Sequence, residues 1–324
     1  MTNTDHSERE FVLDPLKLED LNGYLRGMGW IARESVVKAE RIGAGNMNLT
    51  VRIRMEQGSF ILKQARPWVV KYPHIPAPIE RAAVEARFYR VTAGVAEVSS
   101  QMPQLLGFSE AAHLLWLEDL GEGADFMDCY QGGLLEVKEC RSLTEFLVSL
   151  HSLVVPAEAN AQLRNRAMRE LNHEHQYDLP LRLESGFEDI AGELKADREY
   201  CRGIGDLGAQ YLADGEVLVH GDFFPGSWLR AKGGIAIIDP EFCYLGDAEY
   251  DVGVFLAHLE LLHARELWTV VETYYTRPID WGLARRYAGA ELMRRLIGVA
   301  QLPVRADIDQ KKQWLDFSRE LVCA

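Results

Sequence analysis

Three carboxylates and a hydroxyl follow two apolar runs within one short segment, residues 217–241 (VLVHGDFFPGSWLRAKGGIAIIDPE). The first run leads into a His-Gly-Asp triplet that ends at Asp222, and Ser227 follows five positions later. The second run leads into Asp239 and Glu241. Metal-assisted phosphoryl transfer needs such a set, because one carboxylate must deprotonate a hydroxyl while oxygen ligands hold Mg²⁺ against nucleotide phosphates.

The carboxylates themselves favour a bound cation. Two carboxylates ~4 Å apart repel each other by ~1 kcal/mol in water and by ~4 kcal/mol at an effective dielectric constant of ~20. A bound Mg²⁺ turns this repulsion into attraction. We therefore assign Asp222 as the base that accepts the hydroxyl proton, and Asp239, Glu241 and Ser227 as Mg²⁺ ligands, Ser227 directly or through water. Asp251 is expected to brace the loop through backbone N–H bonds.

A glycine-rich stretch, GAGNMN, lies between two predicted strands and contains four candidate nucleotide-binding residues: Gly43, Gly45, Asn46 and Asn48. Glycines let backbone N–H groups approach a phosphate closely. The stretch lacks the Gly-Lys-Ser/Thr end of a Walker A loop, and a strand follows it, whereas a helix follows a Rossmann loop. Two interpretations of the stretch remain: a lid over the nucleotide like that of a kinase, and a plain hairpin turn.

Lys63 ends the strand that follows the glycine-rich stretch. A lone strand lysine usually faces water. At this position, however, Lys63 is able to reach the α- and β-phosphates of a nucleotide, held by a glutamate of the next helix. Glu85 is the preferred partner, and Glu80 is the second choice.

Composition excludes several other classes of protein. The chain has 324 residues and a net charge of −14, which disfavours nucleic acids and anionic membranes as partners. Its five scattered cysteines include no C-x-x-C pair, which indicates a reducing compartment rather than a disulfide framework or a zinc site. The polar N-terminus lacks a signal core, and no apolar run approaches the ~20 residues of a membrane span. We expect a cytoplasmic protein.

Hydrophobic periodicity predicts strands before about residue 120 and mainly helices after it. A helix is expected to begin near Asp14-Pro15, where Asp caps and Pro fits the first turn. The other expected elements are strands within 41–63, a helix over 79–91, a strand over 114–117, helices over 134–154, 158–174, 187–200 and 205–212, and helices from 251 to the C-terminus.

The order of these motifs resembles the aminoglycoside phosphotransferase and choline kinase group of protein-kinase-like enzymes, over roughly residues 41–295. Within that group the chain is most similar to the 5-methylthioribose kinase family. The likeness is carried by the segments IGAGNMNL, ILKQA followed by Pro-Trp, HGD with Gly-Ser, DPEF and MRRLIG.

The resemblance implies an α+β, bilobal protein-kinase-like fold, with a small β-rich N-terminal lobe (1–118) and a larger, mainly helical C-terminal lobe (119–324). It implies ATP and Mg²⁺ in the cleft, with the backbone of Glu118 and Leu120 facing the adenine. It implies that Arg294 and Arg295 contact the acceptor, and it is compatible with a homodimer.

The acceptor implied by the resemblance is a small molecule with a hydroxyl group, and a methylthioribose-like sugar is favoured. Phe223-Phe224-Pro225 replaces the more polar Leu-His-Thr of that family's loop, so Phe224 is expected to face the acceptor and to change its selection. An amino alcohol, an aminoglycoside or an aromatic alcohol is therefore the alternative. A protein kinase is disfavoured because the Asp-Phe-Gly and Ala-Pro-Glu signatures are missing. The alternative hypothesis from another functional class is a scaffold protein that binds a nucleotide without catalysing a reaction.

Overall fold

The computed structural model describes residues 11–43, 47–184 and 186–324. The chain divides into two compact units. The N-terminal unit comprises Met1–Gly94 and Pro103–Gly121, and the C-terminal unit comprises Val95–Met102 and Glu122–Ala324. The lobe boundary predicted from the sequence, between residues 118 and 119, lies close to the end of the N-terminal unit.

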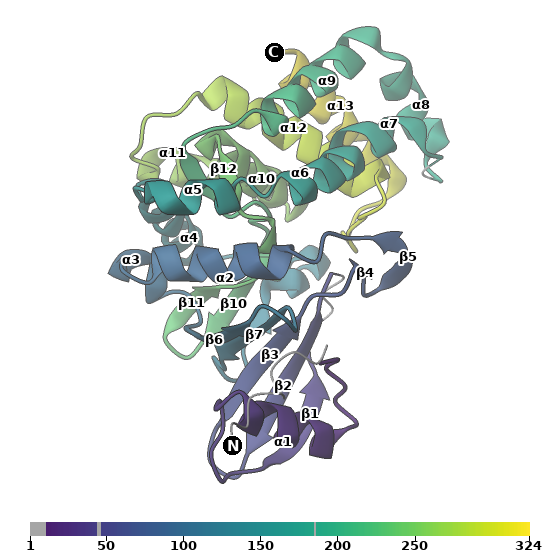
Figure 1. Cartoon of the computed structure of the whole chain (residues 1–324). Coiled ribbons are helices and arrows are strands. Elements are labelled where there is room, and N and C mark those ends of the chain that lie inside the picture. Colours follow the sequence, from purple (N-terminus) through teal and green to yellow (C-terminus); the bar gives the residue numbers. More distant parts are fainter. Residues whose placement is uncertain (1–10, 44–46, 185) are drawn as a thin grey trace. The chain divides into compact units, whose positions relative to one another are not determined.

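The N-terminal unit is built on a five-stranded antiparallel sheet (Figure 1). Val51 and Ile53 are fully buried while Arg52 and Arg54 between and beside them are not, which is the alternation expected of a strand with one face on the core. The strand order is β1 (Val36–Arg41), β2 (Leu49–Met55), β3 (Ser59–Gln64), β7 (Leu114–Glu118) and β6 (Leu105–Ser109), and a separate hairpin joins β4 (Trp68–Val69) and β5 (Tyr72–Pro76).

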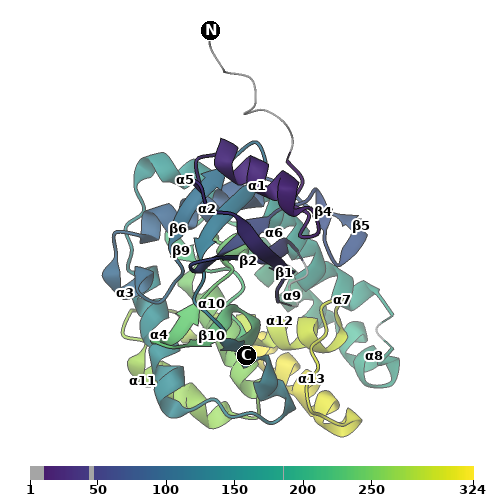
Figure 2. The same ribbon diagram turned by 90° about the horizontal axis from the view of Figure 1, so that it is seen from below.

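Helix α1 (Leu18–Gly27) covers one face of this sheet, with Leu21 and Leu25 in its core (Figure 2). The helix begins later than the sequence predicts. Asp14 forms a turn instead of a cap, because its carbonyl oxygen accepts from the N–H of Lys17 and its side chain accepts from the N–H of Leu16. Helix α2 (Arg81–Thr92) contacts β6 and β7.

The C-terminal unit is mainly helical, as predicted. Its short antiparallel pairs are β9 (Val217–Val219) with β12 (Tyr244–Gly246), and β10 (Trp228–Ala231) with β11 (Gly234–Ile237) and β8 (Ala124–Asp125). Its helices are α3 (Ala96–Ser99), η1 (Phe126–Gln131), α4 (Val137–His151), α5 (Ala157–Leu163), α6 (Arg166–His173), η2 (Glu174–Asp178), α7 (Leu179–Arg182), α8 (Glu188–Ala196), α9 (Arg198–Leu212), η3 (Pro225–Ser227), η4 (Pro240–Phe242), α10 (Ala248–Leu261), η5 (Arg265–Leu267), α11 (Trp268–Tyr274), α12 (Trp281–Ile297) and α13 (Ile308–Cys323).

Helices α10, α12 and α13 form the centre of the C-terminal unit. Helix α12 packs against both of the others, and Figure 1 shows α12 and α13 side by side. The predicted break between residues 200 and 205 does not exist, because α9 runs through it. Gly203 lets α13 approach there, since a Cβ at Gly203 would lie 2.7 Å from Val322 Cγ1.

Within the described ranges, no helix is both long and apolar enough to cross a membrane.

Candidate active site

The loop after β9 is held by a buried aspartate from α10. Asp251, which is fully buried, accepts from the N–H of His220 (2.6 Å) and from the N–H of Gly221 (2.9 Å). Its Oδ2 also lies 3.1 Å from the ring of His151. Hydrogen bonds to a charged carboxylate are stronger than neutral ones, so they fix the backbone just before Asp222. The predicted bracing role of Asp251 is confirmed.

Gly221 is required by both its conformation and its surroundings. Its φ is 84°, and a Cβ there would overlap the carbonyl oxygen of Phe242. We expect Gly221→Ala to lower the free energy of unfolding by more than the ~1–2 kcal/mol that a left-handed backbone alone costs an L-residue.

Urea unfolding of Gly221→Ala and Gly58→Ala provides the measurement. Gly58 has nearly the same φ, 85°, but among the described residues no heavy atom lies within 4 Å of the position that a Cβ would occupy there. Gly58→Ala should therefore show the backbone cost alone. Equal losses in the two variants would contradict the steric role of Gly221.

His220 ties this loop to the segment that carries Asp239. Its Nε2 lies 3.0 Å from the carbonyl oxygen of Ile238, to which the ring donates. Burial lowers the pKa of His220, which keeps the ring neutral with one nitrogen as donor. His220 therefore holds the loop through hydrogen bonds, which is a structural task.

Ser227 is bonded within the same loop. Its Oγ donates to the carbonyl oxygen of Asp222 (3.0 Å), and its carbonyl oxygen accepts from the N–H of Ile238 (2.9 Å). The hydroxyl proton is thereby used inside the protein, whereas the lone pairs of Oγ are still able to face a cation or a water molecule. Its metal role stays a prediction.

Asp239 and Glu241 follow β11 at a sharp change in the chain direction. Asp239 has a φ of 69°, which is uncommon for a residue with a side chain and is often found at functional sites. Glu241 is 2% exposed. Throughout the described ranges, no three His, Cys, Asp or Glu side chains are grouped so as to hold a metal ion. The metal assignments of Asp239 and Glu241 therefore stay predictions.

Asn165 is a residue at this segment that sequence reasoning missed. Its side-chain amide donates to the carbonyl oxygens of Glu241 (3.1 Å) and Cys243 (2.9 Å). Asn165 also has a φ of 46°, which breaks the predicted helix over 158–174 into α5 and α6. Asparagine tolerates this conformation better than most residues, so Asn165 was the available signal for a helix break.

Asp222 is paired with arginines rather than grouped with other carboxylates. Its Oδ1 lies 3.2 Å from Arg295 Nη2 and 3.9 Å from Arg294 Nη1, and its side chain is 18% exposed. Burial raises the pKa of Asp222, although the two arginines act in the opposite direction. The structure thus brings together three of the four residues predicted to face the acceptor.

The fourth of them, Phe224, packs against the same group. Its ring centroid lies 4.7 Å from the guanidinium of Arg295 and 5.5 Å from the ring of His258. A Cβ at Gly226 would overlap the Phe224 ring, so glycine is needed for the ring to lie there. Phe224 therefore holds Arg295 in place, a role that the sequence did not predict.

Lys63 and Glu85 form a buried ion pair in the N-terminal unit. Lys63 Nζ lies 2.7 Å from Glu85 Oε2, and the two residues are 5% and 1% exposed. The preference for Glu85 over Glu80 as the partner of Lys63 agrees with this contact. Whether the pair binds a nucleotide stays a prediction.

Arg81, which no sequence motif pointed to, fixes the end of the glycine-rich stretch. Its guanidinium donates to Asn48 Oδ1 (3.0 Å), to the carbonyl oxygen of Met47 (2.9 Å), and to the carbonyl oxygens of Arg66 and Pro78. Asn48 is thus held in place. Gly43 is described and has a φ of 72°, whereas Gly45 and Asn46 lie outside the described residues.

The segment predicted to face the adenine is anchored by Asp119, which lies between Glu118 and Leu120. Asp119 accepts from Ser59 Oγ (2.6 Å) and from the N–H of Gly121 (3.0 Å), and it pairs with Arg52 (2.8 Å). The N–H of Glu118 donates to the carbonyl oxygen of Gln104 (2.9 Å). That donor is therefore engaged within the sheet, and a contact of Glu118 with adenine would have to use its carbonyl oxygen.

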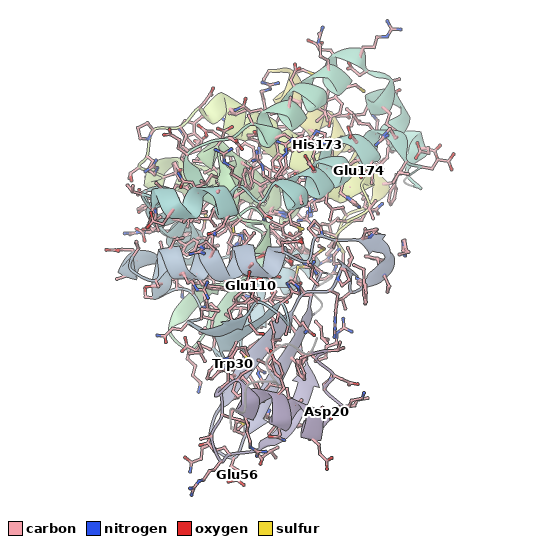
Figure 3. All side chains as sticks on the ribbon, viewed as in Figure 1. Asp20, Trp30, Glu56, Glu110, His173 and Glu174 are labelled. Carbon is pink, nitrogen blue, oxygen red and sulfur yellow. The ribbon has the colours of Figure 1, made fainter. Side chains whose placement is uncertain are left out.

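The His173-Glu174-His175 triplet lies where α6 (Arg166–His173) leads into η2 (Glu174–Asp178). Figure 3 labels His173 and Glu174 on the C-terminal unit. His173 Nδ1 lies 3.7 Å from Asp178 Oδ2, and His175 Nδ1 lies 2.9 Å from the carbonyl oxygen of Leu171. The two histidines thus have separate partners.

Comparisons with known proteins show what the whole chain is similar to. The sequence profile of the phosphotransferase enzyme family matches residues 38–296. A methylthioribose kinase of Exiguobacterium sibiricum is 29% identical over 261 residues, covering 75% of this chain and 65% of that protein. A methylthioribose kinase of Bacillus cereus is 24% identical over 363 aligned positions, covering 92% of this chain and 90% of that protein.

Among solved structures, a spectinomycin phosphotransferase in complex with ADP and spectinomycin has a TM-score of 0.57. It is 15% identical, and the alignment covers 96% of this chain and 99% of that one. This likeness confirms the predicted protein-kinase-like fold. Together with the family profile, the comparisons confirm the predicted family and the class of phosphotransferases.

Proposed function

Since the chain belongs to the phosphotransferase enzyme family, we propose that it transfers the γ-phosphoryl group of ATP to a hydroxyl group of a small molecule. A methylthioribose-like sugar is the preferred acceptor. The acceptor oxygen bonds to the γ-phosphorus, the bond from phosphorus to the β,γ-bridging oxygen breaks, and ADP leaves. The hydroxyl proton passes to Asp222.

The environment of Asp222 is the observation that carries this proposal. Its Oδ1 is held by Arg295 at 3.2 Å. Within the described ranges, its Oδ2 makes no hydrogen bond to the protein. One oxygen is thus fixed while the other is available for a hydroxyl proton, on a backbone that Asp251 and His220 hold rigid. A positioned carboxylate of this kind suits a general base.

The residues assigned to Mg²⁺ fit that ion in type. Asp239, Glu241 and Ser227 offer only oxygen donors, which Mg²⁺ prefers. The left-handed conformation of Asp239 supports a functional assignment. When bound, Mg²⁺ supplies positive charge that stabilises the transferring phosphoryl group. Lys63, held by Glu85, and the backbone of the segment from Gly43 to Asn48 are assigned to the phosphates of ATP.

Arg294 and Arg295 are assigned to the acceptor, as are Phe224 and Asp222. Arg294 Nε is buried, and no hydrogen-bond partner for it lies in the described part of the chain. A buried donor without a partner is costly, which supports a ligand that completes the site. The named methylthioribose kinases among the relatives support a methylthioribose-like sugar, because guanidinium groups donate well to sugar hydroxyls.

An ADP-release assay tests the function. 5-Methylthioribose, related sugars, amino alcohols, an aminoglycoside and aromatic alcohols are supplied with ATP and Mg²⁺. We expect the highest kcat/KM for a methylthioribose-like sugar. A higher kcat/KM for another alcohol would show that the assigned acceptor is wrong, while the assigned reaction, phosphoryl transfer to a hydroxyl group, would stand. Absence of turnover for every acceptor, together with metal-independent ATP binding, would identify a nucleotide-binding scaffold instead.

Two further assignments extend beyond the comparisons. We assign the protein to the cytoplasm, on the basis of the odd number of scattered cysteines. We also assign a homodimer, on the basis of the family resemblance alone. Light scattering during gel filtration measures the molar mass, and a mass near the 36.7 kDa of one chain would contradict the dimer.

A further inference from the structure

A chain of buried hydrogen bonds runs from Asp222 through the arginine pair to three residues without a role in the reaction described above. These residues are Glu291 on α12, His258 on α10 and Tyr130 in η1. All three are at most 3% exposed. We propose that Glu291, supported by His258 and Tyr130, is a positioning residue: it holds the two arginines in a fixed arrangement and keeps Oδ2 of Asp222 available to the acceptor. This inference rests on the proposed function.

Glu291 is the centre of the chain. Its Oε1 accepts from Arg295 Nε at 2.6 Å, and its Oε2 accepts from Arg294 Nη1 at 2.9 Å. Residues three and four positions apart lie on one face of a helix, so a single carboxylate is able to hold both guanidinium groups. The two arginines hold the pKa of Glu291 well below its usual range, although burial acts in the opposite direction. Glu291 is therefore ionised.

His258 contacts the same carboxylate oxygen of Glu291 as Arg295 does. Its Nε2 lies 3.1 Å from Glu291 Oε1, and its Nδ1 lies 2.5 Å from the hydroxyl of Tyr130. Burial lowers the pKa of His258 to about 4, so the ring is neutral and carries one N–H. An ionised carboxylate only accepts, so Nε2–H donates to Glu291 and the hydroxyl of Tyr130 donates to Nδ1. The hydrogen bonds donated by Tyr130 and His258 are thus both directed toward Glu291.

The outer end of the chain is Asp222. Arg295 reaches Asp222 Oδ1 through Nη2 while its Nε is bonded to Glu291, so the planar guanidinium is held through two of its nitrogens. The ring of Phe224 lies over its face, 4.7 Å from the guanidinium carbon. Two positive and two negative side chains are thus packed together, and their charges balance.

Removing the charge of Glu291 would disturb this balance in a specific way. Both arginines would then have Asp222 as their only carboxylate partner within the part of the chain that the structure describes. A guanidinium released from Glu291 is able to turn and bind both oxygens of Asp222, because bidentate pairing is its favoured geometry. Oδ2 would become engaged, and the guanidinium donors would leave the positions assigned to the acceptor.

The alternative is that Glu291 only stabilises the fold. A purely structural role predicts a lower melting temperature and less folded protein, with unchanged KM values for the molecules that remain folded. The positioning role predicts instead that the acceptor KM rises and kcat falls while the KM for ATP does not change.

Steady-state kinetics of Glu291→Gln separate the two roles, with 5-methylthioribose and the other acceptors of the ADP-release panel as probes. We expect kcat/KM for the acceptor to fall by about 100-fold, the loss that follows from a displacement of about 1 Å in a catalytic group. Tyr130→Phe should give a smaller loss of the same kind. Glu291→Asp keeps the charge and should recover part of the activity.

Glu260→Gln is the matched control. Glu260 is another largely buried glutamate, on α10, and it pairs with Arg265 and accepts from the indole N–H of Trp314. No contact links it to Asp222, Arg294 or Arg295 in the ranges that the structure describes. Its variant should lower the melting temperature and leave the KM values of folded protein unchanged.

A double-mutant cycle with Arg295→Lys tests whether Glu291 acts through the arginine. Interacting residues give non-additive effects, so Glu291→Gln should cost less in the Arg295→Lys background than in the wild type. Additive losses, or an acceptor KM for Glu291→Gln equal to that of the wild type, would overturn the positioning role.

Asp222→Ala, assayed in parallel, distinguishes failure of this inference from failure of the proposed function. If the wild type turns over an acceptor, Asp222→Ala does not, and Glu291→Gln equals the wild type, only the positioning role is wrong. If the wild type turns over no acceptor, or Asp222→Ala keeps full activity, the proposed function is wrong and the positioning role fails with it.

Discussion

Asp222→Ala and Asp222→Asn are expected to reduce kcat by about 10²–10⁴-fold, the usual contribution of a general base. Neither side chain accepts a proton as a carboxylate does. The backbone of the loop should persist, because Asp251 and His220 bind it independently of the Asp222 side chain. The affinity for ATP should therefore change little, which equilibrium binding of a fluorescent ATP analogue measures.

The pH dependence of kcat/KM gives a second check on Asp222. Burial raises its pKa, against the effect of the two arginines. Because the base must be ionised, activity should fall as the pH drops through this raised pKa, at a higher pH than for an ordinary aspartate with a pKa of ~3.9.

Asp316→Asn is the control for the Asp222 variants, since this aspartate is 63% exposed on α13. It should keep full activity. Substantial turnover by Asp222→Ala would show that another group accepts the proton.

Lys63→Met should destabilise the protein by about 3–5 kcal/mol, the usual result of removing one member of a buried ion pair. The carboxylate of Glu85, 1% exposed, would remain without its lysine. Urea unfolding measures this loss. If Lys63 also binds the phosphates of ATP, the variant should raise the KM for ATP and lower kcat.

A second variant separates these two effects. Lys63→Met combined with Glu85→Leu removes both charges, and replacing a buried pair by apolar residues is often neutral for stability. Stability should then recover while activity does not. Lys38→Met, in a surface pair where the lysine is 60% exposed, should alter neither property. Recovery of activity in the double variant would leave Lys63 with a structural role only.

Local sequence patterns predicted the elements that carry the site. The alternation in 51–54 predicted β2, and an apolar run followed by His-Gly-Asp predicted a strand that leads into Asp222. The pairing of Lys63 with Glu85 followed from their order along the chain. The two strand predictions succeeded because a strand sets the direction of its side chains over a few residues, whatever surrounds it. The pairing of Lys63 with Glu85 rested instead on the order of motifs typical of kinases.

Other predictions failed where a single side chain bonds to a nearby backbone group. The first helix was predicted to begin near Asp14, but a turn forms there because Asp14 itself accepts two backbone N–H groups. The helix predicted over 158–174 is broken at Asn165, whose amide binds the carbonyl oxygens of Glu241 and Cys243. Periodicity does not report such bonds, because it averages over a whole segment.

The sequence by itself determined the family, the order of the motifs and the identity of the proposed base. Only the tertiary structure decided what holds that base. Tyr130, His258 and Glu291 are far apart along the chain, and Glu291 reads in isolation as an ordinary solvated helix residue. Packing of α12 against α10 and α13 buries it, and a buried carboxylate needs charged or hydrogen-bonding partners. Those partners come from other elements, so their identity depends on how the helices pack and not on the spacing of residues within any one of them.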